Sequence, residues 1–363
     1  MPKSDIFNAK PAPFSKIFQF LSPAENGFIG IVAAYILICA VIAVATGYGH
    51  YFRPFMYLNA GVTMTFNLVM IYVLYRLMRA AFLLIKHKPK EPSEFLLADL
   101  KKGPFNPALY RRALPIFITF FFFFSTFTSV KMLVPRIHDF SWDEFFVRAD
   151  VFLHFGFDPW RLLMAFTAHP LTTYIISLVY ILWLPVFFVV LYWQLFRLKD
   201  PLTRMRFFYT FVLSWAINGT FLALIFSSAG PCYYGLVTGS EHFLDLMDYL
   251  RWVDGQYEVY ALHTQDLLWN NFQKNDVIVG GGISAFPSVH VATAFLFVLL
   301  GAKTGKKTFI AFLIFFGFIL VGSVHLGWHY AVDGYFAILT TYALWWLTGR
   351  FLSASHVAAS PQH

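Results

Sequence analysis

Eight long runs of apolar residues, separated by polar segments, dominate the sequence. A hydrocarbon core of about 30 Å requires roughly 20 apolar helical residues to cross it. Runs of about this length cover residues 28–47, 55–75, 114–134, 172–196, 207–227, 286–302, 308–324 and 331–349. The last three are the shortest, so their edges are the least sharply defined. The pattern predicts an all-α protein, a polytopic membrane helical bundle of about eight spans.

The composition agrees with a membrane protein. Hydrophobic residues make up 58% of the 363 residues and charged residues only 13%, with a mean hydropathy of +0.62. A formal charge of +8 would suit nucleic acid. However, the basic residues gather in alternate connecting segments, which is the positive-inside pattern of membrane proteins. We therefore expect no nucleic-acid partner, and an integral protein of the plasma (inner) membrane.

The charges also predict an orientation. Basic residues gather between the second and third runs, between the fourth and fifth (Arg197, Lys199, Arg204 and Arg206) and between the sixth and seventh (Lys303, Lys306 and Lys307). We expect these segments to face the cytoplasm. Residues 229–284 carry seven acidic residues against Arg251 and Lys274, so this segment should lie on the outer side.

Four parts follow from this order. Residues 1–26 form a cytoplasmic or interfacial N-terminal segment, with a disordered tail as the alternative. Residues 27–112 hold two spans and a basic connector. Residues 113–350 form a six-span catalytic core with the outer loop 229–284, and residues 351–363 a cytoplasmic tail.

Two outer segments have patterns of their own. Residues 141–156 show apolar residues at helical spacing, and Ser141 with Glu144 suggests a capping box, so we expect a helix lying in the outer interface. A structural role for its Asp150 and Arg148 is favoured over substrate handling. The aromatic outer loop 229–284 is too long for a simple connection, and we expect a folded lid or head-group gate.

Three ionisable residues converge on the outer side. His290 lies near the outer end of the sixth span, and His329 and Asp333 lie where the seventh passes into the eighth. Polar groups at membrane depth are costly and are usually kept for function. Asp333 follows His329 by four residues, so a helix beginning near His329 would place the carboxylate beside the imidazole, able to orient it.

These residues carry a resemblance to a known family. The stretches "FPSVH" and "HLGWHYAVD" resemble the second and third signature motifs of the type 2 phosphatidic acid phosphatase superfamily, PSGH and SRxxxxxHxxxD, over roughly residues 113–350. The resemblance implies that His329 attacks phosphorus and forms a phosphohistidine. It also implies that Asp333 orients His329 and that His290 protonates the leaving oxygen.

The sequence departs from the family pattern at the phosphate clamp. Gly322 and Ser323 stand where the third motif has Ser and Arg, and Val289 replaces the Gly of the second motif. The first motif, with a Lys and an Arg-Pro pair, has no clean match; "AGPCYYG" keeps only Pro231. This pattern is similar to the branch of inositol phosphorylceramide synthases, in which a His-His-Asp triad accompanies an altered clamp.

Other groups must then balance the charge of a phosphoryl group. Gly280, Gly281 and Gly282 would turn backbone N–H groups toward it, and a helix beginning near Ser288 would add its positive end. The remaining substrate-binding candidates are Lys131, Arg136 and His325, with snorkelling as the alternative for Lys131 and packing for His325.

The leading hypothesis is an enzyme that cleaves or transfers the phosphoryl or phospho-head-group of a membrane lipid, with a tilt toward transfer to an alcohol or head-group acceptor. The alternatives are a lipid phosphate or isoprenoid pyrophosphate phosphatase, a proton-coupled transporter and a non-enzymatic lipid-binding scaffold. No cofactor is expected. Two histidines and an aspartate could hold zinc, but no HExxH or Cys-rich spacing accompanies them, and we expect no metal.

Overall fold

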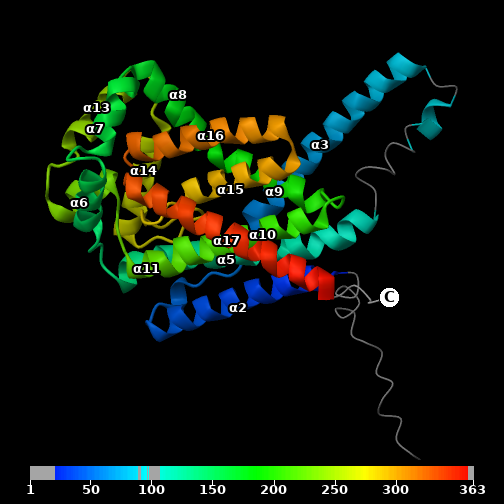
Figure 1. The fold of residues 1–363 in the computed structure, drawn as a ribbon, viewed down its shortest axis with the longest axis horizontal. Coiled ribbons are helices and arrows are strands. Elements are labelled where there is room, and N and C mark those ends of the chain that lie inside the picture. The colour runs from blue at the N-terminus through cyan, green and yellow to red at the C-terminus, as the bar shows by residue number, and fades with distance from the viewer. Residues whose placement is uncertain (1–20, 89–90, 96, 98–106, 359–363) are drawn as a thin grey trace, which may run out of the picture.

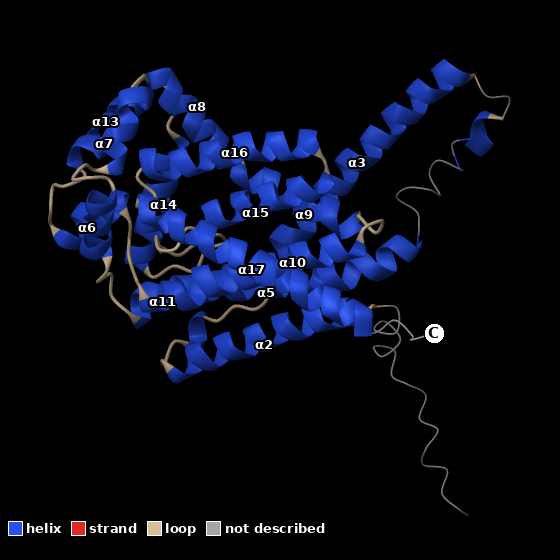
Figure 2. Ribbon diagram, in the orientation of Figure 1, coloured by secondary structure: helices blue, strands red, loops and turns tan. Residues whose placement is uncertain are grey.

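The computed structural model describes residues 21–88, 91–95, 97 and 107–358, and this part of the chain is helical without any strand (Figure 2). Five helical segments are long and apolar enough to cross a membrane: Pro23–Ala45, Arg111–Ile137, Pro170–Phe196, Pro201–Ile225 and Lys306–His325. Helix α15 (Val289–Thr304) is apolar but shorter. The predicted polytopic helical bundle is confirmed.

The eight predicted spans all coincide with helices. They correspond to α2 (Pro23–Ala45), α3 (Leu58–His87), α5 (Pro107–Ile137), α8 with α9 (Pro170–Ile181, Trp183–Phe196), α10 with the π-helical turn η2 and α11 (Pro201–Ala216, Ile217–Leu222, Ala223–Ile225), α15, α16 (Lys306–His325) and α17 (Ala331–Ala358). Helices α3, α15 and α17 are not among the five segments long and apolar enough to cross a membrane, so the count of eight spans stays a prediction.

Local sequence explains where several of these helices begin. Proline, which has no N–H to leave unpaired, occupies the first turn of α2, α8 and α10. Ser22 and Glu25 form a reciprocal capping box at the start of α2. The side chain of Asp200 accepts the Thr203 N–H at 3.1 Å and caps α10.

The core of the bundle is built around α15. This helix packs against α16, α17 and α10, while α8 packs on α16 (Figure 1). Helix α2 lies along α5 and α10 on one side of the bundle, and α3 projects away from it in Figure 1. Helix α15, which carries His290 in its first turn, is therefore surrounded by other helices of the bundle.

A buried ion pair joins α2 to the rest of the bundle. Arg204 Nη1 lies 2.8 Å from Glu25 Oε1, and both side chains are fully buried. Arg112 Nη2 approaches the other Glu25 oxygen at 3.1 Å. The sequence had placed Arg204 in a connecting segment. That placement is wrong, because α10 starts at Pro201 and brings Arg204 into its first turn, where Glu25 compensates its charge.

A cap of short helices covers one end of the bundle. It consists of α6 (Asp143–Leu153), α7 (Pro159–Thr167), η3 (Pro231–Tyr233), α12 (Tyr234–Thr238), α13 (Leu244–Asp254) and α14 (Tyr260–Lys274) (Figure 1). The segment 229–284 is therefore folded, as expected. Its action as a lid stays a prediction.

The helix predicted within residues 141–156 exists, but its predicted start is wrong. Trp142 is the N-cap of α6, and no side chain caps the helix. Instead of capping its own helix, the Asp143 carboxylate accepts a hydrogen bond from the segment that begins the outer loop. The interfacial run predicted within residues 1–26 lies mostly outside the described residues. The basic residues Arg76, Arg79 and Lys86 were predicted to lie in the connector between the second and third spans, but they lie in α3.

Candidate active site

His290, His329 and Asp333 lie together at the capped end of the bundle. His290 is in the first turn of α15, His329 in the turn between α16 and α17, and Asp333 in the first turn of α17. The buried Ser288 side chain caps α15 by accepting the Val291 N–H at 3.3 Å, and the Ser288 N–H donates to the Asp333 carbonyl at 3.3 Å. These contacts tie the start of α15 to the start of α17.

His329 and Asp333 form a direct pair. The Nδ1 of His329 lies 3.3 Å from Asp333 Oδ2, and that same oxygen accepts the backbone N–H of Tyr330 at 3.1 Å. The Asp333 side chain is fully buried. The carboxylate is therefore placed to fix the imidazole and leave Nε2 for chemistry. The ring centroids of His290 and His329 are 6.1 Å apart.

Burial and a nearby cation keep His329 neutral. Burial, followed by the ammonium of Lys131, lowers the pKa of His329 to about 3, against the opposing effect of a backbone hydrogen bond to Ala285. The Lys131 charge also acts on His290. Lys131, predicted as a replacement clamp, is therefore close to both imidazoles, and the His329 ring carries a lone pair at neutral pH.

The glycine triplet lies against α5 beside Lys131. A Cβ on Gly282, whose φ is +100°, would lie 2.8 Å from the carbonyl carbon of Lys131. The N–H of Gly280 donates to the Tyr57 hydroxyl at 2.9 Å, and that of Gly281 to the Ile278 carbonyl at 3.1 Å. Two of the three N–H groups predicted to face a phosphoryl group are thus engaged elsewhere. This geometry favours a role in positioning Lys131.

His325 and Arg136 make hydrogen bonds to residues other than His290 and His329. The His325 Nδ1 lies 3.0 Å from the Thr167 hydroxyl and its Nε2 lies 2.9 Å from the Thr173 hydroxyl. Both ring nitrogens are hydrogen-bonded, which favours the packing alternative. Arg136 donates to Asn275 at 3.0 Å.

Two buried aspartates of α6 hold the segments around the site. Asp150 accepts the N–H of Ala331 at 2.8 Å and that of Val332 at 2.9 Å, and so caps α17. Burial raises the pKa of Asp150 to about 7, opposed by these hydrogen bonds and assisted by the charge of Asp333. This geometry favours the structural role over substrate handling.

Asp143 makes a similar connection to the start of the outer loop. It accepts the N–H of Gly230 at 2.8 Å and the Tyr330 hydroxyl at 2.7 Å, and burial raises its pKa. The Asp143 carboxylate therefore holds residues 229–232 (AGPC) next to the turn that carries His329. This role could not be predicted from the sequence, because Asp143 and Tyr330 are 187 residues apart.

Three aromatic residues around His290 were also missed. The rings of Trp183 and Tyr180 lie 4.4 and 5.3 Å from the His290 ring, and Trp328 stacks on Tyr180 at 6.5 Å. Tyr180 and Trp183 belong to an apolar run and resemble lipid-facing residues there. Of the three, only Trp328 could have been suspected from the sequence, because it directly precedes His329.

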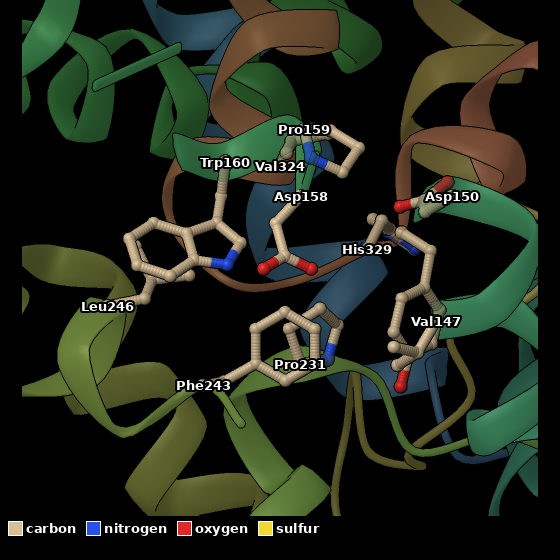
Figure 3. A pocket seen from close by; sticks show the side chains of 11 residues that line it. Val147, Asp150, Asp158, Pro159, Trp160, Pro231, Phe243, Leu246, Val324 and His329 are labelled. Carbon is tan, nitrogen blue, oxygen red and sulfur yellow. The ribbon is translucent and has the colours of Figure 1, made fainter. Parts of the chain in front are cut away.

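A pocket opens beside His329. It is lined by residues of α6, α7, η3, α13, α16 and the turn that carries His329. Figure 3 shows the Asp158 carboxylate between Trp160 and His329. Among the residues that the structure describes, no three His, Cys, Asp or Glu side chains cluster to hold a metal ion.

Comparisons with known proteins identify the family. A family model described as the PAP2 superfamily matches residues 144–347, from α6 through most of α17. This region is more than half of the chain and contains His290, His329 and Asp333. No curated protein and no solved structure matches the chain. The family match supports a lipid enzyme of the phosphatase or phosphotransferase type, and the chain belongs to the PAP2 superfamily.

Proposed function

We propose that the protein transfers the phosphoryl or phospho-head-group of a membrane lipid to an alcohol acceptor through a phosphohistidine at His329. The observation that carries this proposal is the His329–Asp333 contact of 3.3 Å with His290 on the other side of the site, its ring 6.1 Å away. Family membership supports the reaction class.

The first step breaks the substrate's P–O bond. The neutral Nε2 of His329 attacks phosphorus in line with the leaving oxygen, and a P–N bond forms as the P–O bond breaks. Positive charge develops on the imidazole, and Asp333 stabilises it through Nδ1–H. His290, which takes up a proton as the anionic phosphoryl group enters the site, gives that proton to the leaving oxygen.

The second step reverses these roles. The now neutral His290 accepts a proton from the acceptor hydroxyl, whose oxygen attacks phosphorus as the P–N bond breaks. His329 returns to its neutral form and His290 to its protonated form, so protons and electrons balance over the cycle. The Lys131 ammonium, which acts electrostatically on both rings, balances negative charge on the phosphoryl oxygens.

The cap of helices favours transfer over hydrolysis. His329 is 5% exposed, and α6, α7 and α13 contribute to the lining of the pocket beside it. Excluding water from the phosphoenzyme allows an alcohol to compete as the acceptor.

We also place the site on the outer leaflet of the plasma (inner) membrane. Arg204 and Lys306 lie in the first turns of α10 and α16, and Arg112 lies near the start of α5, at the end of the bundle opposite the cap (Figure 1). By the positive-inside rule that end faces the cytoplasm.

The test uses the purified protein with labelled phospholipids and isoprenoid phosphates, each with and without an alcohol such as inositol. A new labelled lipid or head-group ester would support transfer, whereas inorganic phosphate alone would assign hydrolysis. His329→Ala should abolish turnover and the labelling of the protein seen after an alkaline quench, which preserves the acid-labile P–N bond of a phosphohistidine. His263→Ala, which removes an exposed histidine of α14, is the matched control and should retain both activities. Turnover by His329→Ala at the wild-type rate would refute the mechanism.

A further inference from the structure

The aromatic residues around His290 carry buried polar atoms without hydrogen-bond partners in the described part of the chain. Tyr180 and Trp183 are each 6% exposed. The hydroxyl of Tyr180 and the indole N–H groups of Trp183 and Trp328 are buried, and none makes a hydrogen bond to any part of the chain that the structure describes. The Nδ1 of His290 is also buried and makes no hydrogen bond within the part of the chain that the structure describes.

Such a concentration of unpaired donors is unusual. Leaving a buried donor without an acceptor costs about 1–3 kcal/mol, and most buried polar groups in proteins are therefore paired. Here the rings of Tyr180 and Trp183 lie beside His290, Trp328 stacks on Tyr180, and each of these three residues carries an unpaired donor. A ligand with several acceptor oxygens satisfies all of them at once, and a phosphoryl group is such a ligand.

The backbone makes space for Tyr180 at this point. A Cβ on Gly322 would lie 2.9 Å from Cδ2 of Tyr180, so only glycine lets the ring lie flat against α16. The next residue, Ser323, turns its hydroxyl to the Leu320 carbonyl at 2.8 Å and contributes no donor to the site. The Tyr180 ring thus occupies the position that a side chain at residue 322 would otherwise fill.

We propose that the Tyr180 hydroxyl and the Trp328 indole N–H bind the phosphoryl oxygens of the substrate, as neutral donors that act beside the single ammonium of Lys131. Tyr180 and Trp328 stack almost parallel, with an interplanar angle of 8°, and Tyr180 also stacks on His290. The stack therefore connects both aromatic rings to His290, and Trp328 directly precedes His329 in the chain. The inference rests on the proposed function, because it assigns the ligands of the same phosphoryl group.

The experiment compares Tyr180→Phe with a matched control, Tyr35→Phe. Tyr180→Phe keeps the ring against Gly322 and removes only the hydroxyl. Tyr35 is another buried tyrosine, but its hydroxyl lies 2.8 Å from Thr220 Oγ1 on η2. Three quantities are measured for each variant and the wild type: kcat/KM with a lipid phosphate, the inhibition constant of orthovanadate, and the thermal midpoint.

Tyr180→Phe should lower kcat/KM by roughly 10- to 100-fold and weaken orthovanadate by a similar factor, because a donor to the developing charge is lost. Its thermal midpoint should stay the same or rise, since no hydrogen bond within the protein is broken. Tyr35→Phe should show the reverse: a lower midpoint and wild-type kinetics. Trp328→Phe should follow Tyr180→Phe.

Three outcomes would overturn the assignment. Wild-type kinetics in both Tyr180→Phe and Trp328→Phe would refute it and leave the proposed function standing. A fall in the midpoint of Tyr180→Phe as large as that of Tyr35→Phe would give Tyr180 a structural role instead. A wild-type protein that neither turns over a lipid phosphate nor binds orthovanadate would end the proposed function, and the inference with it.

Discussion

The carboxylate of Asp150 accepts the backbone N–H of Ala331 at 2.8 Å, although the two residues are 181 positions apart. This bond caps α17 at the helix turn that carries Asp333, and it fixes the segment that begins two residues after His329. A surface helix of the cap thus holds the orientation of the candidate nucleophile and its partner. The arrangement couples the fold of α6 to the chemistry of the site.

Removing this carboxylate should damage both stability and activity. Asp150→Ala leaves two N–H groups at the start of α17 without acceptors, at a cost of about 1–3 kcal/mol in the free energy of unfolding. The kcat/KM should fall by at least 10-fold, since small misplacements of catalytic groups are costly. Arg148→Ala on the same helix loses only an exposed pair with Glu144 and should match the wild type in thermal unfolding and kinetics.

The raised pKa of Asp150 predicts a pH dependence of stability. Its pKa is about 7 in the folded protein, against an ordinary value of 3.8. A raised folded pKa means that the folded state binds the proton more tightly. This contribution is complete below pH 3.8 and is lost as the pH rises through 7.

Thermal unfolding from pH 4 to pH 8 tests this expectation with Asp150→Asn, whose amide does not titrate. The wild type should lose up to about 4 kcal/mol relative to Asp150→Asn over this range. Parallel pH profiles for the two proteins would show that the carboxyl group does not titrate in this window.

How far the sequence predicts the site depends on how local each contact is. His329 and Asp333 are four residues apart, and the motif and the helical spacing were enough to predict the pair. Asp150 meets Ala331 only through the tertiary fold, and no periodicity relates the two. Tyr180 looks like any aromatic residue of an apolar span, since hydropathy does not distinguish a lipid-facing ring from one that stacks on a catalytic histidine.

Charge patterns had a similar limit. They predicted that Arg204 lies in a connecting segment, but it lies in α10 and is fully buried against Glu25. A buried arginine is tolerated only with a compensating carboxylate, and that carboxylate comes from a helix 179 residues away. The pairing therefore could not be predicted from the neighbourhood of Arg204.

Breaking the Glu25–Arg204 pair should destabilise the bundle without changing the chemistry. Glu25→Gln leaves the Arg204 guanidinium buried without its counter-charge, which costs about 3–5 kcal/mol. The thermal midpoint should fall, while kcat at a temperature where the variant is folded should equal that of the wild type, because the pair lies at the far end of the bundle. Asp248→Asn, which breaks the exposed pair with Arg251, is the control and should change stability by less than about 1 kcal/mol. A loss of kcat in folded Glu25→Gln would contradict this separation.

The ammonium of Lys131 should affect both the substrate and His329. Lys131→Met keeps most of the side chain's volume and removes its charge, so affinity for orthovanadate should fall by about 10-fold or more. The pKa of His329 should rise from about 3, but it should stay below its ordinary value, because burial is the larger cause of the lowering. NMR titration of labelled histidine measures the second effect. An unchanged inhibition constant would remove Lys131 from the phosphate site.

The contact between Gly282 and α5 predicts that even a single methyl group disrupts the site. In Gly282→Ala the new Cβ would lie 2.8 Å from the Lys131 carbonyl carbon and 2.9 Å from the Met132 nitrogen, both of which are backbone atoms that cannot rotate away. The φ of +100° adds backbone strain for any L-residue, of order 1–3 kcal/mol. The loop must therefore move from α5, and Lys131 loses the surface that positions it.

We expect a lower thermal midpoint and a loss of orthovanadate affinity in the same direction as in Lys131→Met. Gly30→Ala is the matched control, since its Cβ would enter open space on α2; alanine there should stabilise the helix by about 0.5–1 kcal/mol and leave the kinetics unchanged. If Gly282→Ala lowered the midpoint but bound orthovanadate like the wild type, the triplet would support the fold without positioning Lys131, and the ammonium would have to be held by α5 alone.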